Sequence, residues 1–336
     1  MNNNIIKQQV SLFILAFAML AGLGACKKDK NIEQPDANSI GRVIGDNFNL
    51  SILNTGLTRS GLKAKLLETG PFTVIAPSDD AFVAAGYNTV ADLIAAEPTR
   101  ISAMMKYHVL DGNYDFNRLP FLFNQEIRSY NGGKLFVTHW VKGTDTVLTI
   151  NGAVLLAKNI KTSNGLIQVV DRVLQPYTFA NVLEAIANER NLTLFYQALQ
   201  RAGLTEVLSK SETYTVFAPD NAAMRAYGLS GLQAIETADP AELRRMLLYH
   251  ILADRRFVYD YILSSGTDTQ VQQTMLDGNA ISVILQPDPS IPNAFNGISL
   301  QGTGNTDEVQ LSNTKRDVLA GNGVVHTIES VLKITQ

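Results

Sequence analysis

The side chains best suited to proton transfer in this sequence are two histidines that each follow a tyrosine. The pairs are Tyr107-His108 and Tyr249-His250. Imidazole titrates near neutral pH, so either pair could act as a general acid or base. Each histidine, however, ends an apolar stripe with helical spacing, formed by Ile101, Met104 and Met105 or by Leu243, Met246 and Leu247. Such a histidine is more often a hydrogen-bonded core group than a catalyst, so we predict a structural role for both.

The other histidines do not suggest a metal site. His326 alternates with Val324 and Ile328 on a predicted strand, which indicates an interior position. Together with His139, the histidines are far apart in sequence and have no H-x-x-H or C-x-x-C spacing. We therefore predict neither a metal nor a cofactor.

Three carboxylates, Asp79, Asp80 and Asp220, form the remaining candidate for acid–base chemistry. Each follows a β-rich run that stops at proline, where a helix is expected to begin. Helix capping, which is worth about 1 kcal/mol per residue, explains them without catalysis. The sequence also has no G-x-S-x-G, no phosphate-binding loop and no dinucleotide-binding motif after a strand. An enzyme is thus the least favoured class.

The capping segments belong to an internal repeat. FTVIAPSDDAF at 72–82 matches YTVFAPDNAAM at 214–224 at five of eleven positions, an offset of 142. The same offset aligns 49–62 with 191–204 at six of fourteen positions. A period this long indicates duplicated domains, because solenoid repeats run about 20 to 50 residues. We predict copy one at 38–176 and copy two at 177–336.

The repeat also locates an insertion in copy two. NGLIQVVDRVLQP at 164–176 matches NGVVHTIESVLKI at 322–334, a shift of 158, so copy two holds sixteen extra residues. We assign twelve of them to the proline-containing stretch 285–305 and predict that this stretch is a loop. Inserted loops often carry function.

Periodicity predicts an α+β fold for each copy. The repeated β-rich run is a strand followed by a capped helix, and each Tyr-His pair ends an amphipathic helix. Short strands follow, with Asn-Gly turn signals at Asn131, Asn151 and Asn164. Helices therefore gather early in each copy and strands late.

Aromatic residues could also form a binding surface. The segment FNRLPFLFNQ at 116–125 is rich in apolar side chains, and His139-Trp140 supplies the only tryptophan. Aromatic platforms bind sugars and proteins, but such residues are more often core, so we favour packing.

Composition excludes one large class of partner. The chain has 336 residues, 46% of them hydrophobic, and a formal net charge of −3 without a basic stripe. Two globular domains fit this length, at roughly 100 to 200 residues per domain. A nucleic-acid-binding surface is not expected.

The N-terminus indicates the compartment. Val10 to Leu23 form an apolar run after Lys7, which is short for a bilayer span of about 20 residues but suits a signal peptide at 1–25. The run ends in LGAC, and Cys26 is the only cysteine. This stretch resembles the bacterial lipobox, which implies lipidation of Cys26, with palmitate among the acyl chains. Residues 26–37 are then a polar tether. By resemblance to the sorting rules of some bacteria, Lys27 after the cysteine favours the outer membrane, where the protein would face either the periplasm or the surface.

The repeated motifs together resemble the fasciclin domain. They are two copies of [FY]-T-V-[IF]-A-P-x-[DN]-x-A-[FM], then Tyr-His, then Asn-Gly before a final strand. The resemblance covers about 38–336 and implies a wedge-shaped β-sandwich with packed helices in each copy. Copy two keeps the closing histidine of the family at His326, whereas copy one has Gln168.

The resemblance implies adhesion or matrix binding without catalysis. In animal relatives the segment around Tyr-His is implicated in integrin contact, so Tyr107, His108, Tyr249, His250 and His326 are adhesion or structural candidates. We expect a lipid-anchored envelope protein whose tandem domains bind a surface polymer, a matrix component, a carbohydrate or a protein. The alternative is a periplasmic or outer-membrane scaffold that accompanies a glycan-uptake system.

Overall fold

The structure is a computed structural model that describes residues 36–292 and 294–334. Ala37 and the residues after it form one compact unit. The predicted signal peptide 1–25, Cys26 and nearly all of the predicted tether 26–37 lie outside the described residues. Within the described ranges, no helix has both the length and the apolar character needed to cross a bilayer.

The helices of copy one are short, and polar side chains define where they begin. The hydroxyl of Ser78 accepts a hydrogen bond from the N–H of Ala81, and Thr89 forms a capping box with Asp92. The α-helices of this copy are α2 (Ile40–Gly45), α3 (Ser51–Arg59), α4 (Leu62–Lys65), α5 (Asp79–Ala84), α6 (Val90–Ala95) and α7 (Pro98–Tyr107). The 3-10 turns are η1 (Phe48–Leu50) and η2 (Phe116–Arg118).

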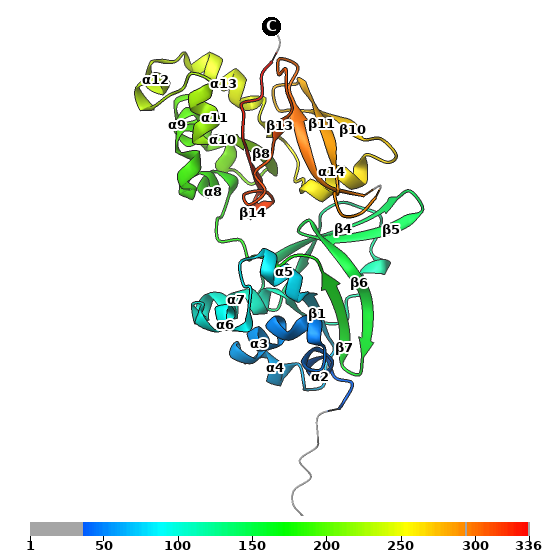
Figure 1. Cartoon of the computed structure of the whole chain (residues 1–336). Coiled ribbons are helices and arrows are strands. Elements are labelled where there is room, and N and C mark those ends of the chain that lie inside the picture. Colours follow the sequence, from blue (N-terminus) through cyan, green and yellow to red (C-terminus); the bar gives the residue numbers. More distant parts are fainter. Residues whose placement is uncertain (1–35, 293, 335–336) are drawn as a thin grey trace, which may run out of the picture. The chain divides into compact units, whose positions relative to one another are not determined.

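Copy two repeats this helical order and adds a helix. Its helices are α8 (Val182–Asn188), η3 (Arg190–Leu192), α9 (Thr193–Arg201), α10 (Thr205–Ser209), α11 (Asn221–Ala226), α12 (Leu232–Thr237), α13 (Pro240–Leu248) and α14 (Val258–Ser264). The predicted amphipathic helices are confirmed, because α7 ends at Tyr107 and α13 ends one residue before Tyr249. Figure 1 shows most helices of each copy on one side of its strands, whereas α14 lies against β11 and β12.

The strands of copy one form a single bent sheet in the order β2-β1-β7-β6-β5-β4-β3. The register of β6 against β7 shifts twice between Leu155 and Ile160, and such bulges bend a strand. The two halves of the sheet then bury residues against each other, as in a sandwich. The strands are β1 (Phe72–Pro77), β2 (Val109–Asp111), β3 (Gln125–Arg128), β4 (Lys134–Lys142), β5 (Asp145–Ile150), β6 (Ala153–Thr162) and β7 (Gly165–Val170).

In copy two the corresponding sheet is divided, with orders β14-β15-β8-β9 and β10-β11-β12-β13. The strands are β8 (Tyr214–Pro219), β9 (Ile251–Leu252), β10 (Gln270–Thr274), β11 (Ala280–Pro287), β12 (Phe295–Gln301), β13 (Val309–Gln310), β14 (Val318–Ala320) and β15 (Gly323–Ile328). In both copies the first strand pairs in parallel with the last, β1 with β7 and β8 with β15. The α+β assignment is confirmed.

The predicted loop at 285–305 is wrong in part. Phe295–Gln301 form strand β12, in which Ile298 and Leu300 are buried against β11. Ile150 pairs with Val137 in copy one, and Leu300 pairs with Val283 in copy two. The offset between corresponding residues of the two copies is thus 146 before this hairpin and 150 after it. Most of the extra residues of copy two therefore lie after β12. The loop was predicted because the stretch contains prolines. The alternation of apolar and polar residues that is typical of a half-buried strand was therefore missed.

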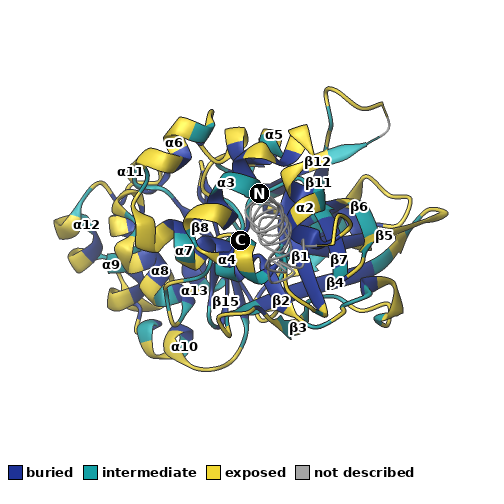
Figure 2. Cartoon of the chain, turned by 90° about the horizontal axis from the view of Figure 1, so that it is seen from below, coloured by how far each residue is buried: buried dark blue, intermediate teal, exposed yellow. Residues whose placement is uncertain are grey.

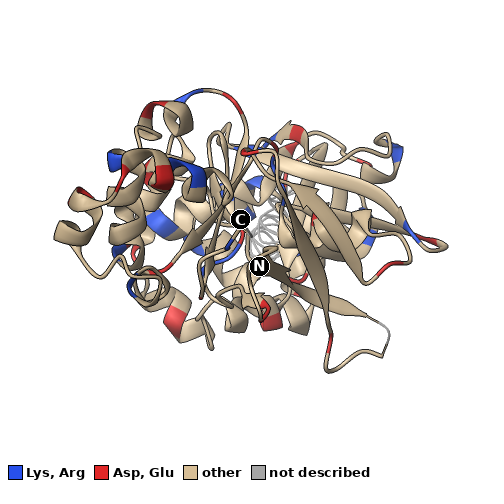
Figure 3. Ribbon diagram, turned by 90° about the horizontal axis from the view of Figure 1, so that it is seen from above, with Lys and Arg blue, Asp and Glu red and all other residues tan. Residues whose placement is uncertain are grey.

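Each copy has its own buried clusters, one among its helices and one between its strands. In copy one these centre on residues such as Leu53 and Val137, and in copy two on Phe195 and Val283. Figure 2 shows the buried residues along the inner strands and on the inward faces of the helices. In Figure 3, basic and acidic positions are interspersed along the ribbon.

Candidate functional site

The Tyr-His pair of copy one is buried and hydrogen-bonded. Tyr107 and His108 are both fully inaccessible to solvent. The backbone N–H of Leu174 donates to Nε2 of His108 at 3.0 Å, so the ring proton is on Nδ1, which donates to the Met104 carbonyl at 2.8 Å. The Tyr107 hydroxyl donates to the carbonyl of Lys134 at 2.5 Å. The pair thus connects the end of α7 to the start of β4 and to the C-terminal segment of the copy.

Copy two repeats these bonds atom for atom. The N–H of Leu332 donates to Nε2 of His250 at 2.9 Å, and Nδ1 donates to the Met246 carbonyl at 2.8 Å. Tyr249 donates to the carbonyl of Ala280 at 2.8 Å. Burial lowers the pKa of both histidines to about 4. Both rings are therefore neutral at pH 7, and neither has a free nitrogen.

His326 is also buried, on β15. The N–H of Asp317 donates to its Nδ1 at 3.1 Å, and Nε2 donates to the Arg256 carbonyl at 3.0 Å. Burial lowers its pKa, although Asp317 opposes the shift. In copy one the amide of Gln168 occupies this place and bonds to Asn159 and Tyr114. A neutral amide thus replaces a neutral imidazole, and both link the last strand to neighbouring segments.

The carboxylates have cap roles that differ in part from the prediction. Asp220 caps α11 as predicted, through the N–H of Ala223. Asp79, by contrast, lies within the first turn of α5 and caps α3, whereas Ser78 caps α5. Asp80 is exposed in the same turn. Among the His, Cys, Asp and Glu side chains that the structure describes, no group of three or more could hold a metal ion.

Two asparagines have a role that the turn signal alone did not reveal. The amide of Asn164 donates to the carbonyls of Leu66 and Glu68 and accepts from the N–H of Ile40. Asn322 makes the three corresponding bonds in copy two, with Leu208, Lys210 and Val182. The recurrence of Asn-Gly at the closing match of both copies was the available signal. These side chains fasten the last strand to the helices.

The aromatic segment of copy one agrees with the packing prediction only in part, because Phe116 is buried whereas the middle of the segment is exposed. Phe121 and Leu122 are 52% and 54% exposed. Phe121 packs at a tilt against the buried ring of His139 with centroids 4.4 Å apart, and Phe123 packs likewise against Trp140 at 4.5 Å. Because the loop folds back on β4, Phe121 and Phe123 pack against rings of that strand instead of entering the core.

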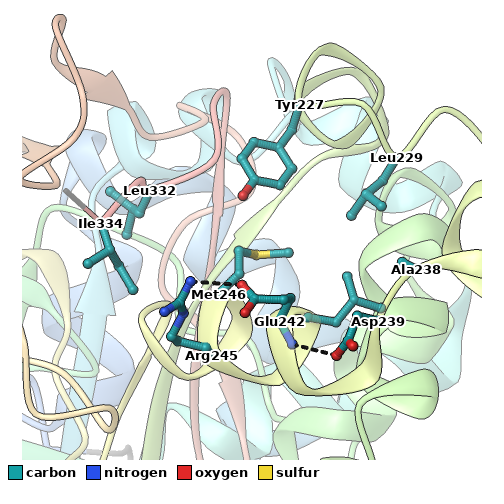
Figure 4. A pocket seen from close by; sticks show the side chains of 10 residues that line it. Tyr227, Leu229, Ala238, Asp239, Glu242, Arg245, Met246, Leu332 and Ile334 are labelled. Atoms are coloured by element: carbon teal, nitrogen blue, oxygen red, sulfur yellow. Dashed lines mark hydrogen bonds and ion pairs between the residues drawn. The ribbon is translucent and has the colours of Figure 1, made fainter. Parts of the chain in front are cut away.

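Copy two has a pocket of about 310 Å³ next to the residues that hydrogen-bond to His250. Figure 4 shows Leu332 and Ile334 on one side, Leu229 and Ala238 on the other, and the Tyr227 hydroxyl pointing inward. Met246 and Leu332, whose backbones bond to His250, line it. At the polar edge, Glu242 pairs with Arg245 at 2.7 Å.

The pocket marks a difference between the copies. Leu229 aligns at the 142-residue offset with Tyr87, whose buried ring packs edge-on against Phe82 at 6.2 Å. A leucine fills less of this space than a tyrosine. Sequence analysis did not identify the pocket, because its apolar residues follow the same pattern as core residues.

A buried polar cluster connects the copies. Asp260 on α14 accepts hydrogen bonds from the Thr138 hydroxyl at 2.9 Å and from the Asn124 amide at 3.0 Å, both in copy one. The guanidinium of Arg255 lies over the ring of Phe136, 3.7 Å from its centroid. Burial raises the pKa of Asp260 to about 6. At the 142-residue offset from Asp260 stands Arg118, so the repeat gave no indication that a carboxylate at this position matters.

A second contact between the copies is an ion pair. Nη1 of Arg172 lies 2.8 Å from Oδ2 of Asp317, and Arg172 also donates to the carbonyl of Gly152. Burial alone would raise the pKa of Asp317, but the charge of Arg172 and the hydrogen bonds from Val258 and Arg172 outweigh it and hold that pKa below its usual value. Asp317 also accepts from the N–H of Val258 at 2.8 Å. One carboxylate of copy two therefore connects the segment after β7 of copy one to the start of α14.

Comparison with known proteins identifies the family. The fasciclin domain model matches residues 48–176 and 190–334. Transforming growth factor-beta-induced protein ig-h3 of Sus scrofa is 25% identical over 272 residues, which are 81% of this chain and 36% of that protein. Human periostin is 29% identical over 60% of this chain and 21% of its own length. The chain thus spans about a third or less of these two relatives.

The chain is also similar to a shorter relative and to a solved structure. Protein sll1483 of Synechocystis is 32% identical over 141 residues, 42% of this chain and 74% of that protein. The FAS1 domain pair of the insect cell adhesion molecule fasciclin I covers 84% of this chain and 95% of its own, with 17% identity and a TM-score of 0.41. Two matches to the domain model across most of the sequence place this chain in the fasciclin family.

Proposed function

We propose that this protein is a non-catalytic binding protein of the bacterial envelope, anchored by lipid at Cys26. The main observation behind the proposal is that the repeated Tyr-His pairs are buried and hydrogen-bonded within their own copy. In both copies each ring nitrogen and each tyrosine hydroxyl bonds to backbone groups of the same copy. The motif therefore stabilises the fold. We infer that ligands bind instead to the surfaces at which the two copies differ.

The features that differ between the copies support binding through exposed surface. Copy one presents the partly exposed Phe121 and Leu122, and copy two has the pocket beside Tyr227. Mixed apolar and polar surfaces of this kind suit a protein or carbohydrate ligand. With two domains in one chain, simultaneous contacts would add avidity.

Two experiments test the proposal. A glycan array combined with capture of envelope components by the full chain should yield a reproducible ligand, and no ligand of any class would contradict binding. Wild-type cells should incorporate labelled palmitate into the protein, and Cys26→Ala should abolish both the label and membrane association. An unlabelled wild-type protein would contradict the anchor.

The scaffold alternative requires a separate test. An adhesin that faces the exterior should be cleaved when protease is added to intact cells, whereas a periplasmic scaffold of a glycan-uptake system should be protected. Cleavage only after outer-membrane permeabilisation would favour the scaffold.

A further inference from the structure

A cleft of about 550 Å³ lies where the segment after β7 meets the segment before β14. Arg100 and Arg172 of copy one line it, together with Lys315 and Arg316 of copy two. Asp317 is the only acidic residue among those that line this cleft in the described ranges. The cleft therefore concentrates positive charge in a chain whose formal net charge is −3.

Two of these four cations are already neutralised. Arg172 pairs with Asp317 at 2.8 Å, and Lys315 pairs with Glu189 at 2.7 Å. The guanidinium groups of Arg100 and Arg316, by contrast, have no hydrogen bond or ion pair with any residue in 36–292 or 294–334. Arg100 and Arg316 thus line one cleft without such a partner for their guanidinium groups among the described residues.

Arg316 has the stronger need for a partner. Its side chain is partly buried, and burial lowers its pKa, although the negative charge of Asp317 opposes the shift. The carboxylate beside it, on Asp317, is already bonded to Arg172 and to the N–H of Val258. A partly desolvated cation without an acceptor is unfavourable, and an anion in the cleft would relieve that cost.

Arg100 does not recur in copy two. At the 142-residue offset Glu242 stands in its place, whereas Lys158, which is also basic, stands at the 158-residue shift from Arg316. Residues that hold the fold recur in both copies, as Asn164 and Asn322 do. Arg100 therefore belongs to the part of the sequence in which the copies have diverged.

We propose that this cleft binds an acidic polysaccharide, with sugar carboxylates paired to Arg100 and Arg316. The planar guanidinium fork matches a carboxylate in a bidentate arrangement. Tyr177, which also lines the cleft, offers a partly buried aromatic face to a sugar ring. The inference rests on the proposed binding function and names the class of ligand.

Native electrophoresis of the full chain in gels that contain polygalacturonate, dextran or poly-L-glutamate tests the inference. Polygalacturonate should retard the wild type most strongly. In the Arg100→Gln/Arg316→Gln variant the apparent dissociation constant should rise roughly tenfold or more per arginine, as expected for charge-assisted hydrogen bonds. Arg225→Gln, an exposed arginine on α11 outside the cleft, is the matched control and should behave as wild type.

Each other outcome overturns a specific part of the inference. Equal retardation of the wild type and the double variant by polygalacturonate would show that the ligand binds outside this cleft, although the proposed binding function would still stand. Retardation by poly-L-glutamate as strong as by polygalacturonate would reject the saccharide class. No retardation by polygalacturonate would reject the acidic ligand, and a neutral ligand from the glycan array would still support the proposed function.

Discussion

The carboxylate of Asp79 accepts hydrogen bonds from Ser51, which lies 28 residues earlier, through both the hydroxyl at 2.6 Å and the backbone N–H at 3.2 Å. It also accepts from the N–H of Ile52 at 3.0 Å. In copy two Asn221 takes this place and accepts from the N–H of Leu194 at 2.9 Å. The repeated [DN] position thus fixes the start of one helix from the first turn of another.

Asp79→Ala should lower the free energy of unfolding by about 1 to 2 kcal/mol, because the first turn of α3 loses its acceptors. Chemical denaturation monitored by far-UV circular dichroism would measure the change. The matched control is Asp80→Ala in the same turn, where the side chain is exposed. Equal destabilisation by the two substitutions would show that charge at the start of α5, and not capping of α3, is responsible.

His250→Ala should destabilise the protein by about 3 kcal/mol, since it removes two buried hydrogen bonds and leaves a cavity. Gln233→Ala, at an exposed position on α12, should have little effect. A His250→Ala protein that melts like the wild type but loses ligand binding would instead assign the ring to the ligand site.

The same histidine should make stability depend on pH. Its folded pKa is about 4, against an ordinary value of 6.5, so its stabilising contribution is present above pH 6.5 and is lost as the pH falls through 4. The difference in unfolding free energy between wild type and His250→Ala should therefore shrink on acidification, by up to about 3 kcal/mol. A difference that stays constant between pH 7 and pH 4 would contradict a buried neutral ring.

The features that the sequence predicted are those that recur in it. The strand-to-helix segment at 72–82, the helix that ends at Tyr107 and the Asn151 turn all follow from local periodicity and turn chemistry. Contacts such as Asp79 to Ser51 depend on tertiary folding, so the prediction identified capping but assigned the wrong helix. Asp260 and Asn124 were not predicted at all, because a contact between the copies need not be repeated within them.

Asp260 should give a pH dependence of the opposite sign. Its folded pKa of about 6 exceeds the ordinary 3.8, so its stabilising contribution is full below pH 3.8 and is lost as the pH rises through 6. The unfolding free energy of wild type relative to Asp260→Asn should therefore fall between pH 4 and pH 7, by as much as about 3 kcal/mol. Urea denaturation at several pH values would measure this difference. A rise over the same range would mean that the carboxylate is stabilised in its charged form.

Gly323→Ala should destabilise the protein by about 3 kcal/mol or more, because the parallel pair of β8 and β15 leaves no room for a side chain. A Cβ at Gly323 would lie 1.9 Å from the carbonyl oxygen of Tyr214, and one at the corresponding Gly165 would lie 1.8 Å from that of Phe72. A backbone contact of this kind can be relieved only by separating the strands. Gly231→Ala, where a Cβ would meet no atom within 4 Å, is the matched control and should change the unfolding free energy by less than about 1 kcal/mol. Comparable melting of the two variants would indicate that β8 and β15 can separate at that end without cost, contrary to the close approach repeated in both copies.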